Sequence, residues 1–249
     1  MIHRIWPPLL VVVLVIAAWQ IYVDSGGVDD LVLASPSQIA QALWDDRALL
    51  LDNLRVTAVE VGLGIVCALV LGLVLGVLLH WFEWTRRALY PLMVGSQAVP
   101  LVILAPLLVY WVGFGILPKL AIIAMICFFP VVVTTFDGLQ RVDPELGKLM
   151  RTLDATRWQT FRLTELPAAL PAALSGARIA VAIAVIGAVL AEQSGSTKGL
   201  GHLMLQAIPN LETPRAYAAV AVMAAFAIAL FYALGLAERR LVDPPPRHS

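Results

Sequence analysis

Long apolar segments, each separated from the next by a shorter polar stretch, recur along this chain. A membrane-crossing helix needs about 20 mostly apolar residues, and inside a bilayer only helices and closed barrels satisfy every backbone hydrogen bond. The composition agrees, because 60% of the residues are hydrophobic and 14% are charged, whereas soluble domains average about 25% charged residues. The sequence therefore predicts an all-α integral membrane protein with six transmembrane helices, at about residues 7–23, 56–80, 88–111, 118–136, 170–191 and 216–236.

The first apolar segment, PPLLVVVLVIAAWQIYV at residues 7–23, follows a short basic start. A secretory signal is one interpretation, because the apolar core is short. An uncleaved span is favoured, because no small-x-small cleavage site is clear and the apolar character continues to Val23. Within the acidic residues that follow, SPSQIAQALW predicts a short helix at the membrane surface, capped by Ser35 or Ser37. Residues 1–53 are thus expected to form a transmembrane helix and a linker.

Glycine and proline distinguish two of the other segments. Gly72 and Gly76 in the second span have the small-xxx-small spacing that lets two helices approach closely in lipid. Pro91, Pro100 and Pro106 fall within the third span, where proline bends or breaks a helix and frees carbonyl groups. The third span is therefore expected to be bent or broken at its prolines.

The basic residues give the predicted orientation. Six spans place both termini on the same side, and the positive-inside rule assigns the more basic side to the cytoplasm. Cytoplasmic termini put twelve of the seventeen lysines and arginines inside, namely Arg4, Arg86, Arg87, Arg141, Lys148, Arg151, Arg157, Arg162, Arg178, Arg239, Arg240 and Arg247. The other five, Arg47, Arg55, Lys119, Lys198 and Arg215, lie outside. The loop at 137–167 and the proline-rich tail at 239–249 are therefore expected in the cytoplasm, and the linker before residue 54 is extracytoplasmic.

The loop at 137–167 is the longest polar interruption, and its sequence is that of two short helices. Asp143 is placed to cap a helix that begins at Pro144. An apolar stripe at i, i+3, i+4 and i+7 then follows, formed by Leu146, Leu149, Met150 and Leu153. A second helix is predicted to start at Thr156, and Gln159 three residues later has the spacing of a capping box. Since such short helices are marginal alone in water, we expect the stripe to dock on another protein.

A long cytoplasmic loop that ends in Leu-Pro before the penultimate span resembles the permeases of binding-protein-dependent ABC importers. RTLDATRWQTFRLTELPAALPAALSGARIA, IGAVLAE and STKGLG are similar to the branch that serves sulfonates, taurine, nitrate and pyrimidine precursors, as are VPLVILAPLLVYWVGFG and FFPVVVTTFDGLQRVDP. The resemblance runs from about Leu33 to Leu241. It implies a type I permease core at 54–238, in the plasma (inner) membrane.

The family's loop signature is Glu-Ala-Ala, three residues, Gly, nine residues, Ile, any residue, Leu-Pro. Alignment on Leu-Pro places its other positions at Lys148, Leu149, Met150, Asp154 and Thr164, none of which matches. Asp154 replaces a glycine that breaks the chain between two helices, and aspartate is one of the few residues that visit the left-handed conformation. Lys148 reverses a charge, so either the partner ATPase is acidic there or the contact is weak.

The resemblance implies that two copies of the chain pair in the membrane, that ABC ATPase subunits dock on the loops, and that an extracytoplasmic solute-binding protein delivers the substrate. The chain lacks a G-x-x-x-x-G-K-[ST] phosphate loop, so ATP is expected to bind to the partner subunit. No catalytic residue, cofactor or nucleic-acid partner is expected. The expected ATPase-coupling residues are Asp143, Leu146, Lys148, Leu149, Met150, Arg151, Leu153 and Asp154.

Polar residues at membrane depth are the candidates for a translocation path. They are Ser96, Gln97, Thr134, Thr135, Glu192 and Gln193. Alternatives remain open, because serine and threonine often bond to their own helix and Glu192 is at the outer end of its span. Arg178 is expected to snorkel inward or to form a structural pair with Asp137 or Glu165.

Other classes of function fit the residues less well. Cys67 and Cys127 lie within apolar runs, so neither a disulfide framework nor a metal site is suggested. A membrane enzyme would need paired acidic ligands on the inner face, and Asp29-Asp30 and Asp45-Asp46 are placed outside. A secondary transporter would show matching broken helices in two halves. That class and a non-coupling assembly subunit remain alternatives to a permease that imports a small polar organic solute or anion.

Overall fold

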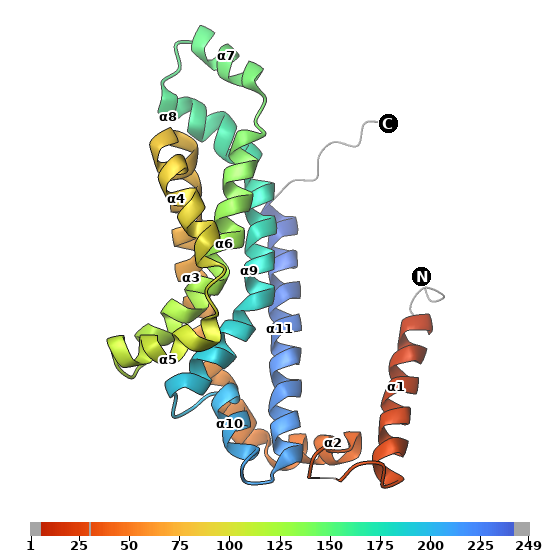
Figure 1. Cartoon of the computed structure of the whole chain (residues 1–249). Coiled ribbons are helices and arrows are strands. Elements are labelled where there is room, and N and C mark those ends of the chain that lie inside the picture. The colour runs from red at the N-terminus through yellow and green to blue at the C-terminus, as the bar shows by residue number, and fades with distance from the viewer. Residues whose placement is uncertain (1–5, 30, 242–249) are drawn as a thin grey trace. The chain divides into compact units, whose positions relative to one another are not determined.

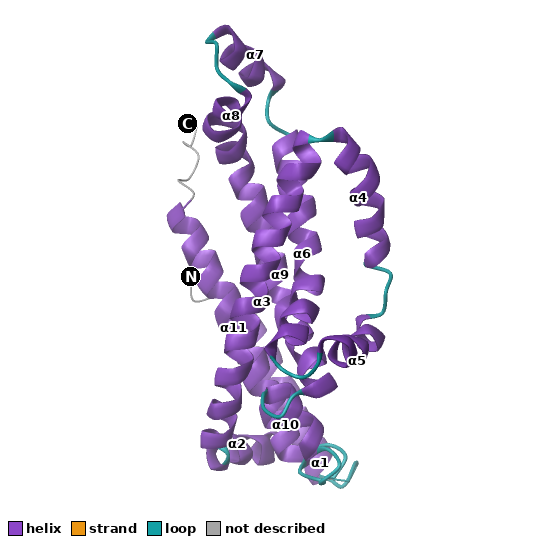
Figure 2. Ribbon diagram, turned by 90° about the vertical axis from the view of Figure 1, so that its left-hand side faces the viewer, coloured by secondary structure: helices purple, strands orange, loops and turns teal. Residues whose placement is uncertain are grey.

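The structure is a computed structural model that describes residues 6–29 and 31–241. Within these residues every regular element is a helix, which confirms the predicted all-α class (Figure 1, Figure 2). The elements are α1 (Trp6–Asp24), α2 (Pro36–Asp45), α3 (Arg47–Trp81), α4 (Glu83–Ser96), α5 (Leu101–Val112), α6 (Ile116–Gln140), α7 (Pro144–Thr152), α8 (Arg157–Thr160), the π-helical turn η2 (Phe161–Glu165), α9 (Leu166–Gly195), α10 (Leu200–Ala207) and α11 (Thr213–Leu241). The predicted tail lies outside the described residues from position 242 onward.

Several helices of the described part are long and apolar enough to cross a membrane. Four of them pass this test alone: α3, α6, the continuous helix Arg157–Gly195 and α11. α4 and α5 together have the composition of a fifth span, although the chain bends by 103° between them. The apolar part of α1, Leu10–Asp24, is shorter. A multi-pass membrane fold is therefore confirmed, and the count of six spans stays a prediction.

α3 begins earlier than predicted. The expected linker extended to residue 53, but the helix starts at Arg47 and continues without interruption to Trp81. No glycine or proline occurs between Arg47 and Gly62, and leucine and alanine, which favour helices, are frequent there. The end of the linker is therefore the first part of a membrane helix.

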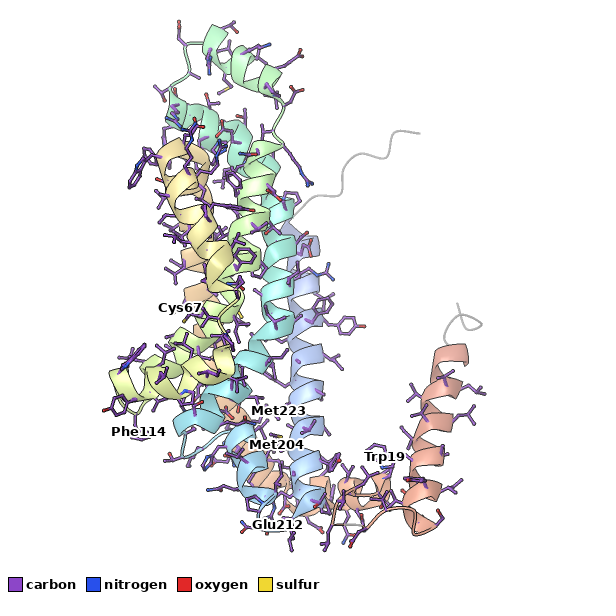
Figure 3. The ribbon with its side chains drawn as sticks, viewed as in Figure 1. Trp19, Cys67, Phe114, Met204, Glu212 and Met223 are labelled. Atoms are coloured by element: carbon purple, nitrogen blue, oxygen red, sulfur yellow. The ribbon has the colours of Figure 1, made fainter. Side chains whose placement is uncertain are left out.

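The third predicted span is broken. α4 ends at Ser96, and α5 begins at Leu101 after the irregular residues 97–100. Pro100 lacks an N–H group and is the N-cap of α5, so it cannot continue the preceding helix. The chain then turns into α6 through Gly113 and Gly115, which have φ values of +92° and +134° that favour glycine. Phe114 of this turn is exposed (Figure 3).

Packing divides the described residues into two compact units. Unit 1 contains the described residues up to Thr57 together with Ser196–Ala225. Unit 2 contains Ala58–Gly195 together with the described residues from Phe226 onward. The residues predicted for ATPase coupling and for the translocation path all lie in unit 2.

Unit 2 is held together by close packing of α3, α6 and α9. A Cβ atom on Gly72 would lie 2.6 Å from Val131 Cβ, and one on Gly76 would lie 2.9 Å from Thr135 Cβ. These distances are shorter than real Cβ contacts, so α6 approaches α3 only because both positions are glycine. The interpretation of the Gly72/Gly76 spacing as a helix contact is confirmed.

Unit 1 is joined by polar side chains. Ser35 caps α2 in a reciprocal capping box with Gln38, which confirms one of the two predicted caps. Asn53 Oδ1 accepts the Gly199 N–H at 2.7 Å, and Thr57 Oγ1 accepts the Leu200 N–H at 3.0 Å. Side chains of α3 therefore satisfy the first N–H groups of α10, a helix that the glycine-rich sequence did not indicate.

Candidate functional site

The first short helix of the 137–167 loop begins and ends as the sequence predicts. Asp143 Oδ1 accepts the Glu145 N–H at 2.8 Å, and Pro144 occupies the first turn of α7. After the helix, Asp154 has a φ of +52°. The Ala155 N–H then donates to the Met150 carbonyl oxygen at 3.0 Å, as is usual for a left-handed helix end. The predicted break at Asp154 is confirmed.

The second helix of the loop is the start of a longer one. Thr156 and Gln159 form the predicted capping box, with reciprocal bonds of 3.3 and 2.7 Å. α8 continues through η2 into α9, and the Leu166 N–H donates to the Phe161 carbonyl oxygen across the wider π turn. Pro167 has no N–H for the carbonyl group of Leu163, which accounts for irregular hydrogen bonding at this point.

Aromatic side chains that the sequence analysis did not single out attach this region to the end of α3. Trp81 lies 5.0 Å from Phe161 and 6.0 Å from Trp158, measured between ring centroids, in edge-to-face geometry. Arg157 donates to the Trp81 carbonyl oxygen at 2.9 Å. The base of the loop is therefore fixed to α3.

The apolar stripe of α7 is uncovered. Leu149 and Leu153 are 55% and 68% exposed, Leu146 is also exposed, and Met150 is partly buried. Exposed leucines at i, i+3 and i+7 leave an apolar face on a helix of nine residues. Such a face favours a partner protein as its cover.

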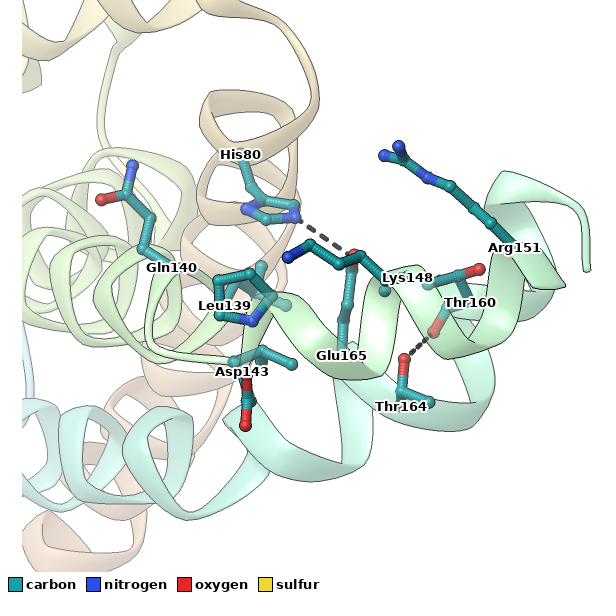
Figure 4. A pocket seen from close by; sticks show the side chains of 12 residues that line it. His80, Leu139, Gln140, Asp143, Lys148, Arg151, Thr160, Thr164 and Glu165 are labelled. Carbon is teal, nitrogen blue, oxygen red and sulfur yellow. Dashed lines mark hydrogen bonds and ion pairs between the residues drawn. The ribbon is translucent and has the colours of Figure 1, made fainter.

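The polar face of α7 has different surroundings. Lys148 and Arg151 line a cavity of about 520 Å³ together with His80 and Glu165 (Figure 4). His80 Nε2 lies 3.1 Å from Glu165 Oε2. The two predicted ATPase contacts that are basic therefore border this cavity, on a different side of the helix from the leucines.

The predicted path residues Ser96 and Gln97 lie at the break between α4 and α5. Ser96 Oγ donates to the Met93 carbonyl oxygen at 2.7 Å, and Gln97 Nε2 donates to Ser96 Oγ at 3.3 Å. Gln97 is exposed. The structure thus brings these two polar side chains together at irregular backbone.

Thr134 and Thr135 lie at contacts between helices. Thr134 Oγ1 donates to the Pro130 carbonyl oxygen of its own helix at 2.8 Å and faces Gly176 of α9. Thr135 is buried against Gly76 of α3. Both threonines therefore have packing roles, and their predicted place on a path stays a prediction.

Glu192 belongs to a buried ionic cluster. Its predicted companion Gln193 is partly buried, whereas Glu192 is fully buried and interacts with Glu60 of α3. Lys119 of α6 lies 2.5 Å from the same Glu60 carboxyl group. The sequence predicts Lys119 on the outer side, at the start of the span at 118–136, and Glu60 was not among the predicted residues, although a lone acid in an apolar span itself indicates a functional or buried partner.

The predicted partners of Arg178 are wrong. Arg178 Nη1 lies 3.3 Å from Glu238 of α11, and its guanidinium group lies 4.9 Å from the centre of the Phe231 ring. Glu165 is bonded to His80 instead, and Asp137 is exposed. The prediction failed because it considered only partners near the cytoplasmic loop, whereas α11 packs beside α9.

Comparisons with known proteins agree on one family. The family model described as "Binding-protein-dependent transport system inner membrane component" matches residues 68–247. A probable ABC transporter permease protein of Haemophilus influenzae is 33% identical over 96% of this chain and 98% of its own length. The formylaminopyrimidine transport permease protein ThiX of Halalkalibacterium halodurans is 34% identical, over 94% of each chain.

A sulfonate transport permease and a solved transporter structure are also similar to this chain. The putative aliphatic sulfonates transport permease protein SsuC of Bacillus subtilis is 31% identical over 94% of this chain and 86% of its own length. Among solved structures, an inward-facing MetNI methionine ABC transporter has a chain that aligns with a TM-score of 0.70 and 19% identity, covering 80% of this chain and 98% of that one. The fold is the same in that structure, and the resemblance to the sulfonate and pyrimidine-precursor branch is confirmed.

Proposed function

Because the chain belongs to the family of binding-protein-dependent transport system inner membrane components, we propose that it is the transmembrane permease subunit of an ATP-driven importer. It is an ABC transporter permease and a multi-pass protein of the inner membrane, like the relatives that it matches over nearly its whole length. Its role is to let a solute pass inward while a separate ATPase supplies the energy.

The uncovered stripe of α7 is the observation that carries this proposal. Leu146 and Leu149 of the capped helix α7, with Leu153 at its C-cap, form an apolar face. The aromatic contacts of Trp81 fix the segment that follows, α8 and η2, to α3. An apolar helix that leads directly into an anchored segment transmits movement of a bound partner better than an unanchored loop does. The partner is the ABC ATPase, which binds the ATP.

The substrate is a small polar organic solute or anion. The support comes from the relatives that are named for formylaminopyrimidine and aliphatic sulfonates. A sulfonate or taurine-like anion and a thiamine-pyrimidine precursor are the two classes that fit. An extracytoplasmic solute-binding protein selects between them and delivers the substrate.

The complete transporter contains two copies of this chain, each with six spans and cytoplasmic termini. The translocation path passes the break between α4 and α5, where Ser96 and Gln97 lie. Irregular backbone at membrane depth is tolerated only inside protein or beside a water-filled cavity, which supports this location. The two polar side chains then supply hydrogen bonds to a polar solute.

Co-purification with the ATPase subunit encoded beside it tests the proposal. We expect the wild-type chain to retain the ATPase through detergent extraction, and Leu149→Glu and Leu153→Glu to release most of it, because each change puts a charge into an apolar contact. Val32→Glu is the matched control, since Val32 is a similarly exposed apolar residue in unit 1 and should leave binding unchanged.

Three results would contradict the proposal. If no ATPase co-purifies, or if the loop variants bind it as well as the control does, α7 is not a docking element. Transport that survives ATP depletion while an ion gradient is maintained would favour a secondary transporter instead.

A further inference from the structure

Three ionisable side chains are buried together in unit 2. Glu60 of α3, Lys119 of α6 and Glu192 of α9 are 4%, 8% and 1% exposed. Lys119 Nζ lies 2.5 Å from Glu60 Oε1, and Glu192 interacts with the same Glu60 carboxyl group. We call these residues the charge cluster. They come from the three helices whose close packing forms the centre of this unit.

The charge cluster contains two acids and one base. If all three side chains were ionised, it would carry one net negative charge in a membrane-spanning region, where an uncompensated buried charge is strongly unfavourable. The other titratable side chains on the parts of α3, α6 and α9 that belong to unit 2 are Cys67, His80, Cys127, Asp137 and Arg178. His80 and Arg178, the two bases among them, are bonded to Glu165 and Glu238. α5, which packs on the same core through Ala105, contributes only the exposed Tyr110.

One atom of the charge cluster also lacks a donor. Glu60 Oε2 is buried and has no hydrogen-bond partner among the described residues. A buried oxygen of this kind loses the hydrogen bonds that water would give it. A proton between the two carboxyl groups would provide an O–H donor at this place and would remove the excess charge. Two carboxyl groups that share one site commonly retain a proton for this reason.

We propose that the charge cluster binds one proton, shared between Glu60 and Glu192, and that the neutral cluster then fastens α3, α6 and α9 together. Lys119 pairs with the remaining negative charge. This assigns Glu192 to a proton-binding and positioning role instead of a place on the path. The charge cluster lies within one folded chain, so its protonation can be tested independently of the proposed transport function.

Substitutions that change the charge of the cluster test the proposal by thermal unfolding of the purified chain in detergent. Glu60→Gln and Glu192→Gln, each alone, should shift Tm by no more than about 2 °C, because the glutamate that remains still supplies one carboxylate for Lys119 and the net charge of the cluster stays zero. The double variant leaves Lys119 without a carboxylate and should lose on the order of 10 °C. Adding Lys119→Met to the double variant should recover most of that loss.

The pH dependence gives a second and independent measurement. A glutamate in the unfolded chain releases its proton above about pH 4.3, whereas the folded cluster keeps it. The folded state then binds one more proton, so stability falls as pH rises. Between about pH 6 and about pH 9, the Tm of the wild type should fall more steeply than that of Glu192→Gln.

Lys198→Met is the matched control for loss of a lysine. Lys198 lies 3.2 Å from Asp52, but the two side chains are 63% and 55% exposed, so removing this ion pair should hardly change Tm. The proposal is overturned if each single glutamine variant loses as much stability as the double variant. That result would mean that both carboxyl groups are ionised in the folded chain and that both stabilise it. Equal pH slopes for the wild type and Glu192→Gln would overturn it as well.

Discussion

Asp154 shows how a single residue preserves a feature of the family loop without matching its motif. The family has glycine at this position, and Asp154 adopts the φ of +52° that would ordinarily select glycine. Aspartate tolerates this conformation because its short polar side chain bonds locally. The backbone therefore keeps the break between α7 and α8, while the side-chain chemistry changes.

Substitutions at Asp154 separate backbone conformation from side-chain chemistry. Asp154→Gly should keep both the stability and the amount of bound ATPase close to wild type, since the relieved strain and the gain in unfolded-state entropy nearly cancel. Asp154→Val should cost about 1–2 kcal/mol, because a β-branched residue is strained at positive φ. Thermal unfolding and ATPase co-purification measure both effects. Similar behaviour of the glycine and valine variants would refute this account of the break.

At the scale of elements, close approach of membrane helices explains more of how the helices are held together than individual polar contacts do. α6 and α9 meet where Gly176 faces Thr134 and the Pro130 carbonyl oxygen. A Cβ atom on Gly176 would lie 1.9 Å from Thr134 Oγ1 and 2.9 Å from that oxygen, so any side chain there must push the helices apart. Without a hydrophobic driving force between helices in lipid, such close contacts hold the bundle together.

Gly176→Ala should therefore destabilise the chain by about 1–3 kcal/mol, as overpacking does elsewhere. Adding Thr134→Ala removes the nearest atom but leaves the carbonyl oxygen, so we expect partial recovery in thermal unfolding. Gly62→Ala is the control, because an added Cβ at this α3 position meets nothing within 4 Å. Equal stability of the Gly176 and Gly62 variants would mean that the α6–α9 contact adapts freely.

At the scale of the whole molecule, the distribution of charge predicts how the chain lies in the membrane. The twelve basic residues assigned to the cytoplasm include Lys148 in the 137–167 loop, and the five assigned to the outside include Lys198. Both side chains are exposed. Opposite sides for these two positions follow from the positive-inside rule alone.

Thiol labelling tests this orientation in a background in which Cys67 and Cys127 are replaced by alanine. A membrane-impermeant maleimide should label Lys198→Cys in intact cells with a permeable outer membrane, because that position is extracytoplasmic. Lys148→Cys should be labelled only after the inner membrane is opened. Labelling of position 148 in intact cells would reverse the orientation and remove the loop from any cytoplasmic ATPase.

The amino-acid sequence by itself determined the features that depend on neighbouring residues. Long apolar segments gave the all-α membrane class, and the caps at Asp143, Thr156 and Ser35 formed as predicted. Each of these rests on hydrogen bonds between residues at most five positions apart. Pro100 likewise predicted a weak point in the third span, where the chain bends by 103° between α4 and α5.

Only the tertiary structure decided which distant side chains meet. Lys119 and Glu60 are 59 positions apart, and Arg178 and Glu238 are 60 apart, so no local pattern pairs them. The sequence placed Arg178 near the wrong acids and counted Lys119 only as a basic residue of the outer side, without predicting a partner for it. The physical reason is that an ion pair depends on the rotation and height of two packed helices, and these are set by small-residue contacts such as Gly72 on Val131. Interactions between neighbouring residues therefore made the helices predictable, whereas the packing of the helices determined which buried charged side chains pair.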